Sequence, residues 1–154
     1  MIAIPGLPLL PTTLLGSYAL PGWYLTALEH VARGEYGETD QREVLEDAAA
    51  TAIGDQERAG LDVVSDGEVR RHDFIMSFYG RLQGLREAPP RRRLGPYLYD
   101  STPVYETVER ITAPAGLGTV EEYRFAVTRA RRPVKVAVPG PLTLTPLSAI
   151  AHRS

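Results

Sequence analysis

The fold of this chain is decided by the sequence GLDVVSDGEVRRHDF, residues 60–74. Its first part, Leu61 to Val64, is a short apolar run that predicts a buried strand. Six ionisable side chains follow within residues 66–73, directly after that strand. In parallel α/β proteins ligands bind at the carboxyl ends of the strands, because loops there carry polar groups while the sheet stays dry. The stretch therefore predicts a binding site at the end of a strand.

Strand and helix patterns alternate before this strand. Leu14-Leu15 predicts a first short strand, and residues 23–33 predict a helix that Gly34 closes. A longer helix follows, with Asp40 as its expected cap and apolar residues at helical spacing up to Gly60.

The same alternation resumes after an irregular stretch at about 85–118. Within that stretch, residues 104–111 alternate as one strand of a hairpin. A capping box at 119–122 then opens a helix, and residues 134–138 predict a third buried strand. A further helix is expected to begin near Ser148.

Strands that alternate with helices in this order favour a parallel sheet with right-handed crossovers. A complete barrel of eight such units needs roughly 250 residues, whereas this chain has 154. We therefore predict an α/β fold, a partial (β/α)8 TIM-type barrel of about the first three βα units. The hairpin-like segment at about 85–118 would be an insertion in a single domain over residues 1–154.

The bulk composition excludes several classes of protein. With 44% hydrophobic and 23% charged residues, the chain resembles an ordinary globular domain. A net charge of −2 gives no electrostatic basis for binding nucleic acid or a membrane surface. The first residues lack the features of a signal peptide or a membrane span, so we expect a cytoplasmic protein.

Three predicted strand ends carry glycine beside polar residues. They are Gly16-Ser17, Asp66-Gly67-Glu68 and the segment 139–143. Parallel strands would bring all three to one rim, where glycine lets a ligand approach the backbone and N–H groups can hold a carboxylate. Glycine and proline after a strand are also ordinary turn formers, and this alternative applies to each end taken alone.

The charged residues after the second strand have several interpretations. Glu68 is the leading candidate, because its carboxylate could pair with an ammonium group. Asp66 could line the site or brace the turn, and Arg71 with Asp73 could line the site or form an internal ion pair. His72 could be a general acid or base, or a bystander.

No metal site can be assembled from the sequence pattern. The chain has no cysteine, and His30 and His152 have no partner at ligand spacing. We therefore expect no metal ligand in this chain. Which residues, if any, are catalytic is left open by the sequence.

Three motifs occur together in the order that a known family has them: TTLLGSY at 12–18, AGLDVVSDGE at 59–68 with Arg71 and Asp73, and PVKVAVPGPLT at 133–143. Together they resemble the catalytic barrel of cobalamin-independent methionine synthase and its shorter relatives, in its amino-terminal part. That family transfers a methyl group from a methylated tetrahydrofolate to the zinc-bound thiol of homocysteine. The resemblance implies that Leu15, Gly16 and Ser17 hold the carboxylate of an amino acid and that Glu68 receives its ammonium group.

The resemblance also has departures. His72 stands where the long synthases carry asparagine, and Asp66 stands where they carry histidine. The shorter relatives include enzymes that act on other thiols, so a related thiol alkyltransferase is one alternative. A non-catalytic binding or assembly subunit of the same fold is another.

The zinc ligands of the family come from later strands than this chain contains. Zinc lowers the pKa of a thiol and so supplies a thiolate near neutral pH. We therefore expect the chain alone to bind no cofactor and to be inactive, as a split or truncated enzyme. Its expected partners are a second polypeptide with the rest of the barrel, or another copy of itself, and a small amino acid or thiol.

Overall fold

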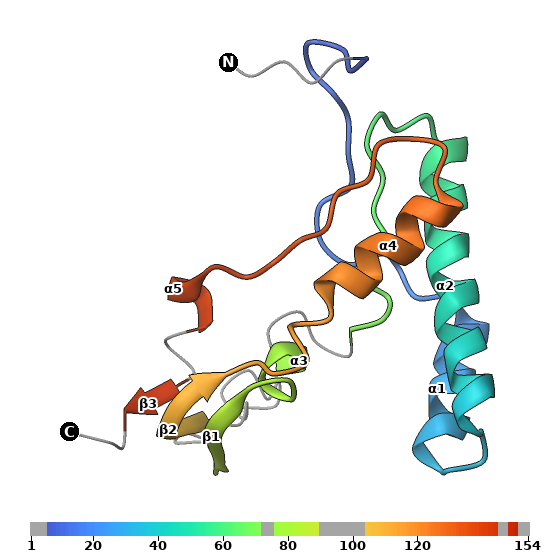
Figure 1. Cartoon of the computed structure of the whole chain (residues 1–154). Coiled ribbons are helices and arrows are strands. Elements are labelled where there is room, and N and C mark those ends of the chain that lie inside the picture. Colours follow the sequence, from blue (N-terminus) through green and yellow to red (C-terminus); the bar gives the residue numbers. More distant parts are fainter. Residues whose placement is uncertain (1–5, 72–75, 90–103, 145–147, 151–154) are drawn as a thin grey trace, which may run out of the picture. The chain divides into compact units, whose positions relative to one another are not determined.

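The computed structural model describes residues 6–71, 76–89, 104–144 and 148–150 (Figure 1). The chain divides into two compact units. The first comprises Met1–His72 with Thr119–Ala137, and the second Asp73–Gly118 with Val138–Ser154. None of the helices in the described ranges is both long and apolar enough to cross a membrane.

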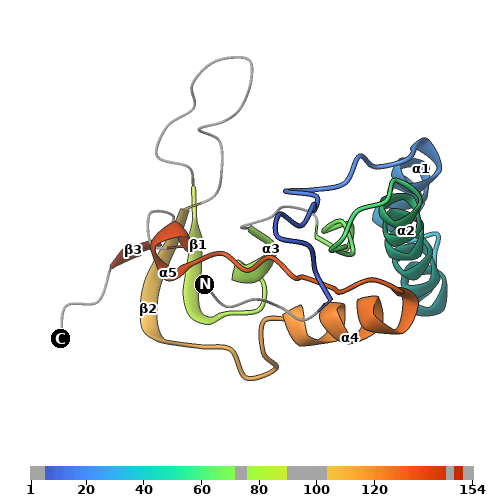
Figure 2. The same cartoon turned by 90° about the horizontal axis from the view of Figure 1, so that it is seen from above.

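The first unit contains three helices: α1 (Gly22–Ala32), α2 (Glu38–Arg58) and α4 (Thr119–Arg129). Both α1 and α4 pack against α2, and α1 runs alongside it in Figure 2. The helices expected over 23–33, after Asp40 and after Thr119 are confirmed.

The expected cap of α2 is wrong by three residues. The helix begins at Glu38, with Gly37 as its cap. Asp40 is the third residue of the helix, and its carboxylate reaches back to accept a hydrogen bond from the Gly37 N–H at 3.0 Å. An acidic side chain in the first turn satisfies an N–H group there as well as a cap residue does.

The three segments expected as strands lie side by side and run parallel. Thr13 pairs with Val63, and Val64 pairs with Val134, both in parallel bridges. Val64 donates its N–H to Pro133 O and accepts the Lys135 N–H, each at 2.9 Å. The α/β class and the parallel order are therefore confirmed, although each pairing is an isolated bridge.

Two apolar clusters fix the helices against these segments. In one, Ile53, Val64 and Ala126 are at most 1% exposed, so the central segment is enclosed between α2 and α4. In the other, small residues of α2 pack against Tyr24 and Val69. Alanines on the inner face of α2 let the neighbouring backbone approach closely, as dense packing requires.

The second unit contains the remaining elements: α3 (Met76–Tyr79), β1 (Gln83–Ala88), β2 (Val104–Thr112), α5 (Pro141–Leu144) and β3 (Ser148–Ile150). β1 and β2 form an antiparallel hairpin, which confirms the strand expected over 104–111. The helix expected near Ser148 is wrong, because that segment pairs parallel with β2. The helix was expected only because strands and helices alternate along the chain, and residues 148–150 satisfy their backbone groups by pairing with β2 instead.

Candidate functional site

The candidate site centres on the tight turn that follows the central parallel segment. Gly67 has a φ of +71° and Glu68 a φ of +57°. A left-handed conformation is uncommon for a residue other than glycine and costs on the order of 1–3 kcal/mol. Glu68 is the one such residue in the described part of the chain. Such strain persists only where surrounding contacts hold it in place.

Three hydrogen bonds among residues 65–71 hold the backbone of this turn. Asp66 Oδ1 accepts the Glu68 N–H at 3.0 Å, and Ser65 Oγ accepts the Gly67 N–H at 3.2 Å. The Arg71 N–H donates to Glu68 O at 3.0 Å. Asp66 therefore braces the turn, which is the structural alternative foreseen for it.

Gln56 of α2 anchors the strand end just before the turn. Its amide nitrogen donates to Ser65 O at 2.8 Å, and its amide oxygen accepts the Ser65 N–H at 3.0 Å. The side chain thus pairs with Ser65 as a neighbouring strand would, and it is only 3% exposed. This residue was not predicted from the sequence, where a glutamine on the otherwise apolar face of α2 was the available signal.

The first parallel segment delivers Ser17 beside Glu68. The Tyr18 N–H donates to Gly67 O at 2.8 Å, so the two loops are joined through the backbone. Ser17 Oγ lies 3.4 Å from Glu68 Oε2. The structure therefore brings together two of the residues that the sequence analysis assigned to one site, from positions 51 apart in the chain.

The other members of the predicted carboxylate site have more open surroundings. Gly16 has a φ of +80°, and nothing lies within 4 Å of the position that a Cβ would occupy. The Leu15 side chain is 92% exposed. The backbone at Gly16 is thus open to the approach of a ligand, whereas the Leu15 side chain forms no wall.

A buried ion pair lies behind the turn. Arg71 Nε and Nη2 contact Glu122 Oε1 and Oε2 of α4 at 3.2 and 2.5 Å. The two side chains are 3% and 11% exposed. From the sequence, Glu122 was expected only as part of a capping box. Its contact with Arg71 was not predicted, and it makes Glu122 an additional candidate for a functional role.

Burial raises the pKa of the Asp66 carboxyl above its usual range. The hydrogen bond from the Glu68 N–H opposes this increase, and the nearby Glu122 carboxylate adds to it. Asp66 Oδ2 is buried and has no hydrogen-bond partner among the described residues. The side of the turn that is buried in the protein therefore contains both acidic and basic side chains.

Part of the predicted site is not located by the described residues. Asp73 and His72 lie outside them, so their roles stay predictions. The segment 139–143 belongs to the second unit. Its place on a common rim with Ser17 and Glu68 also stays a prediction.

The described residues do not form a site for the zinc ion that the family resembled by the three motifs would use. No three histidine, aspartate or glutamate side chains gather there as metal ligands would. The chain has no cysteine either. We therefore assign no zinc ligand to these residues.

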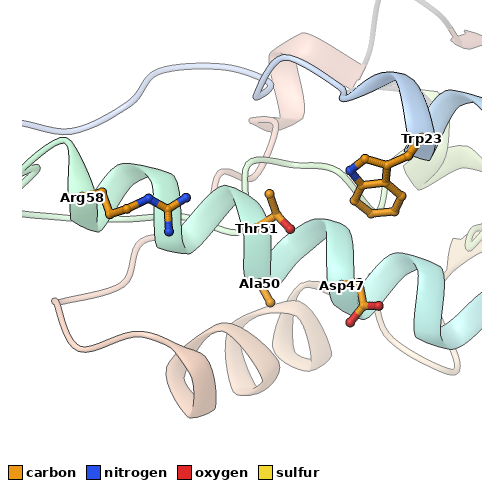
Figure 3. A pocket seen from close by; sticks show the side chains of 5 residues that line it. All are labelled: Trp23, Asp47, Ala50, Thr51 and Arg58. Atoms are coloured by element: carbon orange, nitrogen blue, oxygen red, sulfur yellow. The ribbon is translucent and has the colours of Figure 1, made fainter.

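A separate pocket of about 530 Å³ lies beside α2, and its lining differs from the residues named above (Figure 3). It is lined by Trp23 of α1 and four α2 residues: Asp47, Ala50, Thr51 and Arg58. Their side chains point in different directions in Figure 3 and do not converge on one point. We place the candidate site at the Glu68 turn instead, because polar groups from two strand ends meet there.

The fold and the turn together define an α/β protein with a polar site at the ends of parallel segments. Residues 10–153 match the family described as the catalytic domain of cobalamin-independent synthase. The chain therefore belongs to the cobalamin-independent methionine synthase family. This confirms the resemblance that the three motifs carry.

Individual relatives agree with this assignment. The chain is 35% identical to a methionine synthase of Sulfurisphaera tokodaii and 33% identical to one of Saccharolobus solfataricus, over 90% of its length in both cases. It spans 40% and 41% of those proteins. A B12-independent methionine synthase from a Shewanella species, solved in complex with selenomethionine, superposes with a TM-score of 0.70 at 25% identity. That match covers 94% of this chain and 42% of the other.

Proposed function

We propose that this chain supplies half of the amino-acid site of a methionine-synthase-like methyltransferase. In this proposal residues 1–154 are the opening part of a TIM-type barrel. The adjacency of Ser17 and Glu68, 3.4 Å apart at the ends of two parallel segments, is the observation that carries it. The selenomethionine complex of the Shewanella relative supports an amino acid as the ligand.

The chemistry of the two loops suits the two charged ends of an amino acid. The Glu68 carboxylate would receive the ammonium group, because an ionised acceptor makes the stronger hydrogen bonds. The open backbone at Gly16 and the Ser17 hydroxyl would hold the carboxylate, as N–H groups at such turns hold anions. Two opposite charges gripped from neighbouring strands would fix the direction of the side-chain thiol.

The methyl-transfer step itself is assigned to residues outside the described ones. In the family, zinc supplies a thiolate nucleophile and a methylated tetrahydrofolate supplies the methyl group. We infer that this chain contributes neither the zinc ligands nor the folate site. Its part would be to bind and orient the amino acid, with homocysteine or a related thiol as the acceptor.

We infer further that additional polypeptide covers the outer flank of α4. Val120, Tyr123 and Val127 form an apolar stripe there and are 54%, 47% and 47% exposed. The stripe adjoins Ala126, which is buried against α2 and the central segment. The apolar face of α4 is therefore wider than the part that α2 and the central segment cover. The remaining part of the domain, which the relatives possess, is the occupant we propose.

The test is the affinity for L-methionine of the wild-type chain and of Glu68→Gln, measured by calorimetry. The amide keeps the shape but loses the charge, and a hydrogen bond to a charged group contributes about 1.5–3 kcal/mol. We therefore expect binding roughly ten- to a hundred-fold weaker. Glu43→Gln is the matched control, because Glu43 is exposed on α2. Equal affinity of Glu68→Gln and wild type would remove the proposed role of Glu68.

A further inference from the structure

The turn that carries Glu68 is tied to helix α4 through one residue. Arg71 donates its backbone N–H to Glu68 O at 3.0 Å. Its guanidinium meets Glu122 with two nitrogen–oxygen contacts, at 3.2 and 2.5 Å. A bidentate arginine–carboxylate contact fixes direction as well as distance. The orientation of Arg71, and through it the carbonyl of Glu68, is therefore set from α4.

We propose that Glu122 is a positioning residue, which acts through Arg71 to hold Glu68 in its binding conformation. The proposal rests on the proposed function of Glu68. The side-chain contacts of Glu122 that the structure describes are to Arg71, and not to Ser17 or Glu68. Its effect on the ligand would be indirect.

The left-handed conformation of Glu68 explains why such a tie is needed. Its φ of +57° is costly for a residue with a side chain, so a turn without support would relax toward more ordinary angles. Relaxation would move the Glu68 carboxylate away from Ser17. The bond to Asp66 supports the N–H side of Glu68, and Arg71 supports its carbonyl side.

The ion pair is better explained by positioning than by stability. A buried arginine–glutamate pair gains little net stability over an apolar pair of similar volume, because both charges lose their hydration. Here the Arg71 side chain is 3% exposed and that of Glu122 11%. The guanidinium of Arg70, the preceding residue, lies 4.0 Å from the centre of the Phe125 ring, so a second cation packs against α4. A fixed geometry for the turn is the property that an apolar pair would not supply.

The experiment compares the whole wild-type chain with Glu122→Gln by two measurements. Amide hydrogen exchange reports the turn, residues 66–71, with α2 as internal reference, and calorimetry reports binding of L-methionine. Glu121→Gln is the matched control, because this neighbouring glutamate is exposed on the same helix. Arg71→Lys is the second variant, since it keeps the charge but loses the bidentate contact.

For Glu122→Gln we expect exchange in the turn to accelerate by about tenfold more than exchange in α2, and binding to weaken roughly tenfold. Glu121→Gln should match the wild type in both measurements. Unchanged exchange in the turn, or equal acceleration in α2, would overturn the positioning role. Should Glu122→Gln fail to fold, Arg71→Lys takes its place, and its exchange in the turn is compared with its exchange in α2 in the same way. Wild-type chain that does not bind L-methionine would refute the proposed function, and the exchange data would still decide the role of Glu122.

Discussion

Gly67 offers the sharpest test of how the two loops of the candidate site fit together. Its φ is +71°, and a Cβ at this position would lie 2.6 Å from Tyr18 Cβ and 3.0 Å from Ala52 Cβ. Neither neighbour can give way cheaply, because the atoms are the Cβ positions of two backbones. We therefore expect Gly67→Ala to destabilise the chain strongly.

The expected magnitude has two parts. The left-handed conformation costs an alanine about 1–2 kcal/mol. Forcing an extra carbon into a packed site costs about 1–3 kcal/mol more. The free energy of unfolding should therefore fall by about 2–5 kcal/mol in total.

Gly34→Ala is a matched control that separates the two parts. Gly34 has a φ of +70°, but nothing lies within 4 Å of its Cβ position. Both variants lose the same chain entropy in the unfolded state, so this term cancels between them. Urea denaturation followed by circular dichroism should give a difference of about 1–3 kcal/mol, with Gly67→Ala the less stable. Equal losses in the two variants would refute the close approach of Tyr18, Gly67 and Ala52.

Two further predictions concern buried polar groups. Gln56→Leu should lower the free energy of unfolding by about 1–3 kcal/mol for each backbone group of Ser65 that loses its hydrogen bond. An unchanged urea denaturation curve would contradict the anchoring role of Gln56. Burial, opposed by the Glu68 N–H and supported by Glu122, raises the pKa of Asp66, so folding favours the protonated carboxyl. The contribution of Asp66 to stability is complete below its pKa in the unfolded chain, about 3.9, and is lost as the pH rises through its higher pKa in the folded chain. Asp66→Asn should therefore gain stability relative to the wild type as the pH rises above about 4 in parallel urea titrations, and a difference that stays constant with pH would contradict this prediction.

Local patterns along the chain were sufficient to predict the elements near the site. The apolar run from Leu61 and the abrupt change at Asp66 predicted a buried segment that ends in a polar turn. The parallel order followed from the alternation of strands with helices, and it placed Ser17 near Glu68. These features depend on near neighbours in the sequence or on general rules of chain connection.

The supports of the turn could not be predicted in the same way. Glu122 lies 51 residues from Arg71, and its local pattern of Thr119 to Glu122 matched a capping box equally well. A helix was expected from Ser148 because strands and helices alternate before it, and nothing in the local sequence announces the pairing with β2. In both cases a contact between residues distant in the sequence decided the outcome.

The supports of the Glu68 turn named above all come from the first unit. Gln56 anchors the preceding strand end, Tyr18 closes the turn from the first segment and Glu122 holds Arg71 from α4. A site whose geometry is fixed before the ligand arrives loses less entropy on binding. The conformation of the proposed amino-acid half-site therefore depends on the helices that pack around it in this chain. In the proposed enzyme the remainder of the domain would add the chemistry to a binding element that is already formed.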